Sequence, residues 1–177
     1  QELLKDKGQF RVRDLQMNSA QEDSGLTYFK NQVVFTSSRH DLLLAKRKWN
    51  GNNLNFLDLY VADIDSLGEI TTYTLMGNSI NKKYHEGPIS YNKKGSVLFV
   101  TRNNYLAKSH DGTTKLELFE SKLHDGKWTS PEPFPYNDKE YSVGQPAVSI
   151  KGNILYFVSD MPGGKGGTDI YRSIRSP

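Results

Sequence analysis

Three acidic residues occupy the same place in a pattern that the sequence repeats, which makes them the first candidates for chemistry. The pattern is acid, aliphatic, aromatic, any residue, small residue, and it begins at Asp58, Glu117 and Asp169. Carboxylates gathered on one face could hold a hard cation through their oxygens. One acid per repeat also suits a hydrogen bond or ion pair that belongs to the fold, with Arg39 and Asp160 as candidate partners. We favour this structural role and extend it to the aromatic residues of the pattern, Tyr60, Phe119 and Tyr171.

A glycine cluster, Gly163-Gly-Lys-Gly-Gly167, raises the alternative of anion binding. Backbone N–H groups there, with Lys165 adding positive charge, could form a nest for a phosphate. A phosphate loop, however, needs a helix whose N-terminus faces the ligand, and the segment that follows, Thr168-Asp-Ile-Tyr171, has the composition of a strand. Glycine also permits the positive φ angles of a tight loop. We therefore interpret the cluster as a hairpin turn.

The remaining polar motifs select no catalytic or metal site. The histidines show none of the spacings typical of zinc ligands, and no Gly-x-Ser-x-Gly elbow surrounds a nucleophilic serine. Ser109-His-Asp-Gly-Thr-Thr114 partly resembles the Asp-box turn of sialidases, which is structural and cannot supply catalysis. We expect a protein that is not an enzyme, with no catalytic residues, no cofactor and no metal.

The strongest candidate for partner binding is a basic and aromatic run in a long loop, formed by Lys46, Arg47, Lys48 and Trp49. Cations beside an indole ring could contact a phosphate or a glycan. A short basic run is also common on a solvated surface. The length of the loop that contains it is the stronger indication of function, since residues 40 to 55 separate two predicted strands. Long loops in compact domains are often functional or disordered. If the chain binds a partner, we expect the contact here.

Composition limits the class of partner. Lys plus Arg number 23 against 20 for Asp plus Glu, and these charges are scattered, which argues against nucleic acid. The absence of cysteine excludes disulfides and thiolate metal sites. No run approaches the roughly 20 apolar residues of a spanning helix, so we expect no membrane span in this segment.

The elements that must position these residues form a threefold repeat. Each repeat contains an inner strand, an apolar strand, a variable loop and an acid-aromatic strand. The apolar strands are Val33–Arg39, Val97–Arg102 and Leu155–Asp160, which we centre on Phe35, Phe99 and Phe157. Fourth strands are expected at Glu69–Leu75 and, at an edge, Lys127–Phe134. Four antiparallel strands repeated in this way are typical of β-propeller blades, so the sequence predicts an all-β fold.

The segments LYFVSDMPGGKGGTDIYRS and FLDLYVADI resemble the WD-like propeller repeats of TolB-type proteins. The likeness extends to propellers of Bacteroidetes cell-envelope proteins that also carry a peptidoglycan-binding OmpA-like domain, among them accessory proteins of type IX secretion. It covers roughly residues 10 to 177. The resemblance implies a periplasmic location associated with the outer membrane, with other cell-envelope proteins as partners. It also implies contact with peptidoglycan through a domain outside this segment.

These observations predict an N-terminal segment, residues 1–19, followed by a partial propeller, residues 20–177, with blades at about 20–82, 83–141 and 142–177. Phe10-Arg-Val-Arg-Asp14 is a candidate closing strand. Closed propellers need at least four blades, so we expect about three adjacent blades of a larger propeller, with one end open. The expected function is a non-catalytic scaffold for protein–protein interaction in a cell-envelope or secretion assembly. A carbohydrate-binding or glycan-hydrolysing propeller is the alternative.

Overall fold

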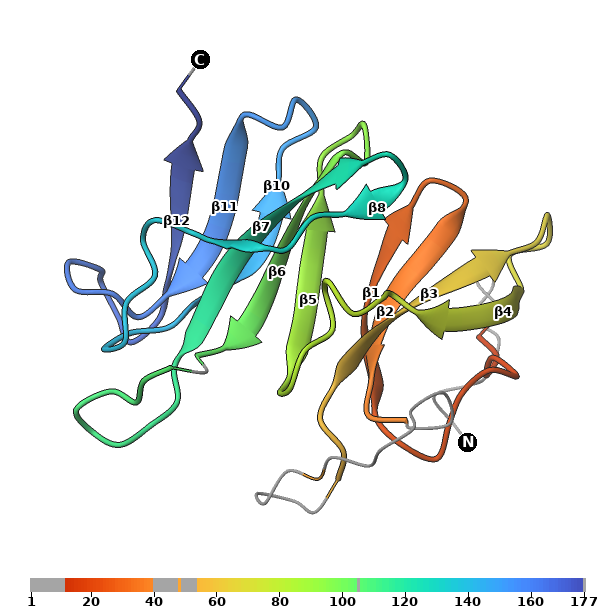
Figure 1. Ribbon diagram of the computed structural model, residues 1–177, viewed down its shortest axis with the longest axis horizontal. Coiled ribbons are helices and arrows are strands. Elements are labelled where there is room, and N and C mark those ends of the chain that lie inside the picture. The colour runs from red at the N-terminus through yellow and green to blue at the C-terminus, as the bar shows by residue number, and fades with distance from the viewer. Residues whose placement is uncertain (1–11, 40–47, 49–53, 105, 177) are drawn as a thin grey trace.

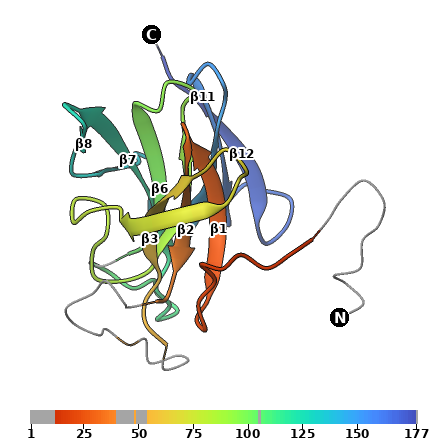
Figure 2. The same cartoon turned by 90° about the vertical axis from the view of Figure 1, so that its right-hand side faces the viewer.

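The computed structural model describes residues 12–39, 48, 54–104 and 106–176 (Figure 1). Within these ranges the regular structure consists of strands, which form three antiparallel sheets and no helix. This confirms the predicted all-β class. Among the described residues the sheets do not close into a barrel; they stand side by side in chain order, and Figure 2 shows them one behind another from the side of the first sheet.

The first sheet contains four strands in the order β1-β2-β3-β4. Their bounds are Asp23–Phe29, Gln32–Ser37, Asp58–Ile64 and Ile70–Leu75. The second sheet contains the strands β5 (Glu86–Tyr91), β6 (Val97–Asn103) and β7 (Leu116–His124). Two strands of two residues each, β8 (Lys127–Trp128) and β9 (Glu132–Pro133), both pair with β7. The third sheet contains β10, Val143–Val148, β11, Ile154–Ser159, and β12, Asp169–Ile174. One sheet thus falls within each of the three predicted ranges.

Cross-strand register reveals which residues are equivalent in the three sheets. Phe35 lies opposite Tyr60, and Phe157 lies opposite Tyr171, with nearly parallel rings in both pairs. In the second sheet, Val100 lies opposite Phe119. The centring of the repeat on Phe99 is therefore wrong by one residue. Both neighbours in the pair Phe99-Val100 are apolar and buried, so alternation could not separate the two faces.

Each sheet consequently has two distinct faces. We call the face that carries Tyr60, Phe119 or Tyr171 the rear face, and the opposite face, which carries Leu59, Leu118 or Ile170, the forward face. Successive side chains of a strand point to opposite faces, so the acid and the aromatic residue of the repeated pattern lie on one face and the aliphatic residue lies on the other. The stack therefore has a direction, which runs from the first sheet to the third.

Forward and rear faces meet at two internal interfaces. Val34 and Leu59 of the first sheet pack with Leu98 and Val100 of the second. Phe99 and Leu118 on the forward face of the second sheet pack with rear-face residues of the third, Leu155 and Phe157, and with Phe134. Full burial of such side chains contributes about 1.5–3 kcal/mol each, so these two layers hold the sheets together.

A glycine on the inner strand allows close approach at both interfaces. Gly87 of β5 faces Thr36 of the first sheet, and a Cβ at Gly87 would lie 2.1 Å from Thr36 Cγ2. Gly144 of β10 faces Thr101 in the same way, at 2.8 Å. Thr36 and Thr101 are equivalent in register, since they lie opposite Leu59 and Leu118. The two interfaces therefore repeat the same contact.

An asparagine side chain extends the pairing of each acid-aromatic strand. Asn81 accepts a hydrogen bond from Leu59 N at 2.8 Å and donates to Leu59 O at 2.9 Å. Asn137 makes the same two bonds with Leu118, at 2.9 and 2.7 Å. The carboxamide acts as a surrogate strand residue and satisfies the backbone where a neighbouring strand is missing. Sequence reasoning missed both asparagines.

The rear face of the first sheet, which we call the covered end, is sealed although no sheet precedes it in the structure. Its core is Val33, Phe35, Tyr60 and Ala62, all at most 4% exposed, with Met17 packed against them. Arg39 lies over three rings, with its guanidinium carbon 4.5 Å from the centroid of Tyr73. A cation can cover aromatic faces in this way without being stranded in an apolar site.

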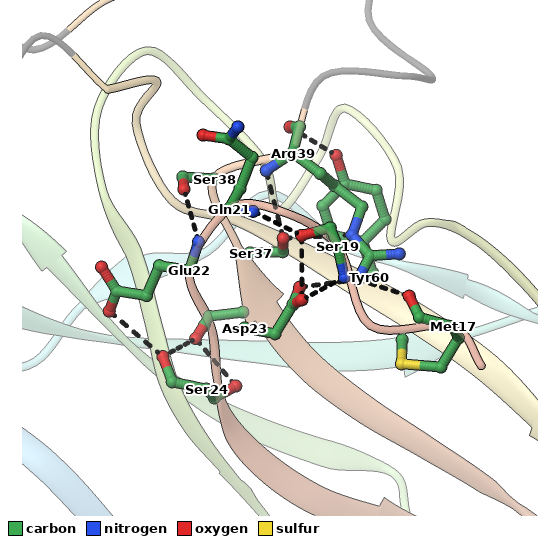
Figure 3. Close-up of polar contacts among 11 residues, drawn as sticks. Met17, Ser19, Gln21, Glu22, Asp23, Ser24, Ser37, Ser38, Arg39 and Tyr60 are labelled. Atoms are coloured by element: carbon green, nitrogen blue, oxygen red, sulfur yellow. Dashed lines mark hydrogen bonds and ion pairs between the residues drawn. The ribbon is translucent and has the colours of Figure 1, made fainter. Parts of the chain in front are cut away.

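A polar network fixes Arg39 in this position (Figure 3). Its guanidinium donates to Asp23 Oδ1 at 2.6 Å and to the carbonyl of Met17 at 3.2 Å. The other carboxylate oxygen of Asp23 accepts from the backbone N and the hydroxyl of Ser19. The segment before β1 is thereby tied to the covered end. Val12, Arg13 and Asp14 lie in no strand, and Phe10 and Arg11 fall outside the described residues, so the closing strand stays a prediction.

The forward face of the third sheet, which we call the open end, is bare. Ile170 is 78% exposed and Ile174 58% exposed, and Tyr156 and Arg172 are also exposed. The equivalent Leu118 in the second sheet is fully buried. Within the described ranges, no helix is long and apolar enough to cross a membrane.

Candidate functional site

A groove of about 610 Å³ lies where the loops of the first and second sheets meet. Its lining residues come from the ends of the β2–β3, β4–β5 and β6–β7 connections. The ribbon of these connections runs along the lower edge of the sheets in Figure 1. Its lining combines rings, amides, hydroxyls and one lysine: Phe56, Tyr84, His85, Asn103, Asn104, Leu106, Ala107, Lys108, Thr113 and Thr114. This mixture of apolar surface with a few polar groups is typical of ligand sites.

An aromatic cluster forms the wall on the side of the first sheet. The ring centroids of Phe56 and Tyr84 are 5.3 Å apart, and those of Phe56 and His85 are 4.9 Å apart, both in edge-to-face geometry. His85 Nδ1 accepts a hydrogen bond from Leu57 N at 3.1 Å. This bond ties the β4–β5 connection to the start of β3 and holds the cluster in place.

The other wall is a stiffened loop of the second sheet. Asn104 is buried, and its side-chain oxygen accepts from the backbone N of Leu106 and Ala107, at 2.8 and 2.9 Å. Leu106 itself is 97% exposed at the rim. The amide oxygen of Asn103 is buried and accepts no hydrogen bond from the described residues.

The loop continues into a tight turn that fixes the far rim. Ser109 N donates to the carbonyl of Thr113 at 3.0 Å, and Gly112 N donates back to Ser109 O at 2.9 Å. Hydrogen bonds from Ser109 and Thr113 hold the pKa of Asp111 far below its usual range. The Asp111 carboxylate thus organises the turn, as in an Asp-box, and Thr113 and Thr114 remain exposed at the groove.

Burial lowers the pKa of His85, and the negative charge of Glu22 only partly opposes this shift. At neutral pH the ring is therefore uncharged, which its role as acceptor at Nδ1 also requires. Lys108, at the rim, supplies positive charge, and Lys83 lies 5.4 Å from the ring centroid of Tyr84. The groove therefore combines a neutral aromatic wall with positive charge at its edge.

The predicted binding loop is only partly described. Lys48 is exposed and pairs with Asn55 in an isolated bridge, directly before Phe56. Lys46, Arg47 and Trp49 lie outside the described residues. The assignment of this loop to partner binding stays a prediction.

The repeated acids lie in three different sheets and in different surroundings. Asp58 is 2% exposed, whereas Glu117 is half-buried and burial raises its pKa. Asp169 accepts hydrogen bonds from Lys165 N at 2.7 Å and from Gly166 N at 3.0 Å. Within the described ranges, no group of three His, Cys, Asp or Glu side chains could hold a metal ion.

The glycine cluster is a turn closed by a carboxylate of the chain itself. The backbone N–H groups that could bind a phosphate donate their hydrogen bonds to Asp169 instead. The element that follows the cluster is the strand β12 and not a helix. Gly163 has a φ of 96°, which suits glycine. Two residues were candidate partners for the repeated acids. Arg39 forms its ion pair with Asp23, and the carboxylate of Asp160 lies 3.8 Å from the Nζ atom of Lys115.

Most of the groove residues were not anticipated from the sequence. Phe56, Tyr84 and Lys108 come from three loops, and only the fold brings them together. The one available signal was an aromatic or amide residue next to each predicted strand end, as in Tyr84-His85 before β5 and Asn103-Asn104 after the apolar run of β6.

Comparisons with known proteins place no relative beside this chain: no family model, curated protein or solved structure is significantly similar to it.

Proposed function

We propose that this chain is a non-catalytic scaffold that holds a segment of a partner protein in the groove. The observation that carries the proposal is the lining itself, in which edge-on rings, exposed Leu106 and the polar residues Asn103 and Asn104 surround one groove of about 610 Å³. Apolar anchors beside a few fixed polar groups suit a peptide segment, whose side chains fill the apolar part and whose N–H groups donate.

The finer architecture that fits this role is a run of adjacent β-propeller blades. Support comes from the shared register of the three sheets, from the repeated glycine and asparagine contacts, and from the resemblance to TolB-type repeats. Propellers commonly present loops from several blades at one end, and the groove lies between loops of two sheets. In this reading the three sheets belong to a larger propeller.

The cellular setting follows from the resemblance alone. The setting that we propose is the bacterial cell envelope, in the periplasm at the outer membrane, with other envelope proteins as partners in a structural or secretion assembly. Peptidoglycan would be contacted through a domain outside this segment.

Photo-crosslinking from the groove tests the scaffold function. Benzoylphenylalanine placed at Leu106, at the rim, should give a defined protein adduct in Bacteroidetes cells. The matched control is Leu67, which is 81% exposed on the β3–β4 turn and should give none. Phe56→Ala and Lys108→Glu in the Leu106 derivative should each abolish the adduct without lowering thermal stability by more than a few degrees. Adducts from both positions, or from neither, would contradict the proposal.

Glycan binding is the second candidate because Asn103, Thr113 and Thr114 offer hydrogen-bonding groups beside the ring of Tyr84. Sugars stack on rings and pair their hydroxyls with amides. Calorimetric titration with peptidoglycan fragments and neutral oligosaccharides separates the two functions. Saturable binding lost in Tyr84→Ala would favour a glycan module, and release of reducing ends would show a hydrolase.

A further inference from the structure

We propose that the open end is the docking surface for one further antiparallel sheet of the same repeat, and that this sheet carries an acidic residue opposite Arg172. The inference rests on the proposed run of repeated sheets and does not depend on what binds in the groove. It rests on an interface that the molecule already forms between its second and third sheets, and on the residues that the third sheet presents in the same positions.

Register defines those positions. Phe99 lies opposite Glu120 on the forward face of the second sheet, and Tyr156 lies opposite Arg172 on the forward face of the third. Leu118 and Ile170 are equivalent in the same way, each opposite a residue of the apolar strand. The open end thus repeats the aromatic and aliphatic pair of a face that is known to pack.

The forward face of the second sheet shows what covers such a surface. The ring of Phe134 lies between Phe99 and Phe157, with centroids 6.4 and 5.5 Å away. Leu118 is fully buried, and Asn137 bonds to its backbone N and O. Ile170, by contrast, is 78% exposed. A further sheet with an aromatic residue and an asparagine at these places would bury it.

Charge identifies the partner more closely. Glu120 on the forward face of the second sheet forms an ion pair with Arg175, which ends the third sheet, at 2.5 Å. Arg172 stands at the position of Glu120 with the opposite sign. By analogy with this pair, a docking sheet complements Arg172 with an acid where the third sheet has Arg175, since two arginines in contact would repel.

A second copy of this chain fits less well. Symmetric contact of two open ends would bring Arg172 of one copy near Arg172 of the other. Head-to-tail contact would require the covered end of the second copy, where Phe35 and Tyr60 are already at most 2% exposed beneath Arg39. The committed occupant is therefore a separate sheet with a free rear face and an acid at its edge.

A tandem chain tests this inference. Residues 1–176 are followed by a second copy of residues 125–176, because Ser176 already stands at the position of His124, and the copy supplies Phe134, Asn137 and a rear face. Because the natural sequence has no cysteine, Ile170→Cys in the first part gives a single probe of the open end. Reaction with a thiol reagent should be rapid in the plain chain.

Three versions of the tandem chain isolate the charge. With Arg175→Glu in the copy, the probe should react at least about tenfold more slowly than in the plain chain. The docked copy must first move away from the open end before the reagent can reach the thiol. With Arg172→Glu and an unmodified copy, the slowing should be similar. With arginine at both positions, it should stay below about threefold. Leu67→Cys, remote on the β3–β4 turn, should react equally in all of them.

The version with Arg172→Glu keeps the test valid if the copy with Arg175→Glu does not fold. Its two facing residues are a glutamate and an arginine, as in the existing pair of Glu120 and Arg175. No slowing in either complementary version would overturn the docking surface. Equal slowing in all three would overturn the requirement for an acid. Slowing in the plain chain that increases with protein concentration would show that a second copy covers the open end, and would overturn the proposed occupant.

Discussion

The covered end and the open end are both outward sheet faces, yet Tyr60 is fully buried at one and Ile170 is 78% exposed at the other. The covered end is aromatic, so a cation with its own carboxylate partner can lie flat on it, as Arg39 does with Asp23. The open end presents Ile170 and Ile174 beside Tyr156 and Arg172, and Ile170 is left largely in solvent. The comparison teaches that a directional stack can be sealed by a short polar segment at its rear face but needs another packed layer at its forward face.

We expect the largest change in stability when the cation is removed from the covered end. Arg39→Ala should lower the free energy of unfolding by about 2–4 kcal/mol, because it leaves a partly buried carboxylate without its ion-pair partner. Urea denaturation measures this loss. Arg172→Ala at the open end is the matched control and should change stability by no more than about 0.5 kcal/mol. Equal losses in the two variants would show that Arg39 does not seal the covered end.

Acid offers a second measure of the same contact. Burial acts to raise the pKa of Asp23, but hydrogen bonds from Ser37, Ser19 and Arg39 outweigh it and hold the pKa below its ordinary value. The stability that Asp23 contributes is thus present above its unfolded pKa of about 3.9 and is lost as the pH falls through the lower folded pKa. Asp23→Asn should remove this part of the pH dependence of the unfolding midpoint; an unchanged acid limb would contradict the assignment.

A pair of equivalent tyrosines sharpens the comparison. The hydroxyl of Tyr60 donates to the carbonyl of Arg39 at 3.0 Å in the covered end, whereas that of Tyr171 donates to Met161 O at 3.2 Å in a more exposed place. Tyr60→Phe should cost about 1 kcal/mol because a buried carbonyl loses its donor, and Tyr171→Phe about half of that. Thermal unfolding of the two variants gives the order. The reverse order would mean that the covered end is the looser of the two.

The smallest expected effect lies at the open end. Ile170→Lys should change the free energy of unfolding by no more than about 0.5 kcal/mol, since the side chain is solvated. Leu67→Lys, on the β3–β4 turn, provides a control of similar exposure. Strong destabilisation by Ile170→Lys alone would show that this face is packed in solution, and sedimentation velocity would then show whether a second copy packs there.

Local pattern predicted the strands well because each apolar run is bounded by turn residues. It misplaced the second repeat by one residue, since Phe99 and Val100 are both buried and alternation carries no information there. The partner of Arg39 was also missed: Asp23 lies on the inner strand, and no short spacing connects the two. The groove could not be predicted for the same reason, because Phe56, Tyr84 and Lys108 become neighbours only through sheet packing.

The asparagine contacts have a consequence for how such a chain can vary. Asn81 lies 22 positions after the leucine whose backbone it binds, and Asn137 lies 19 positions after its own. The asparagine therefore returns to the same backbone position of its sheet from connections of different length. Insertions between a strand and its asparagine should leave the spacing of the sheets unchanged, so this connection is where evolution or an engineer can add new loops at little structural cost.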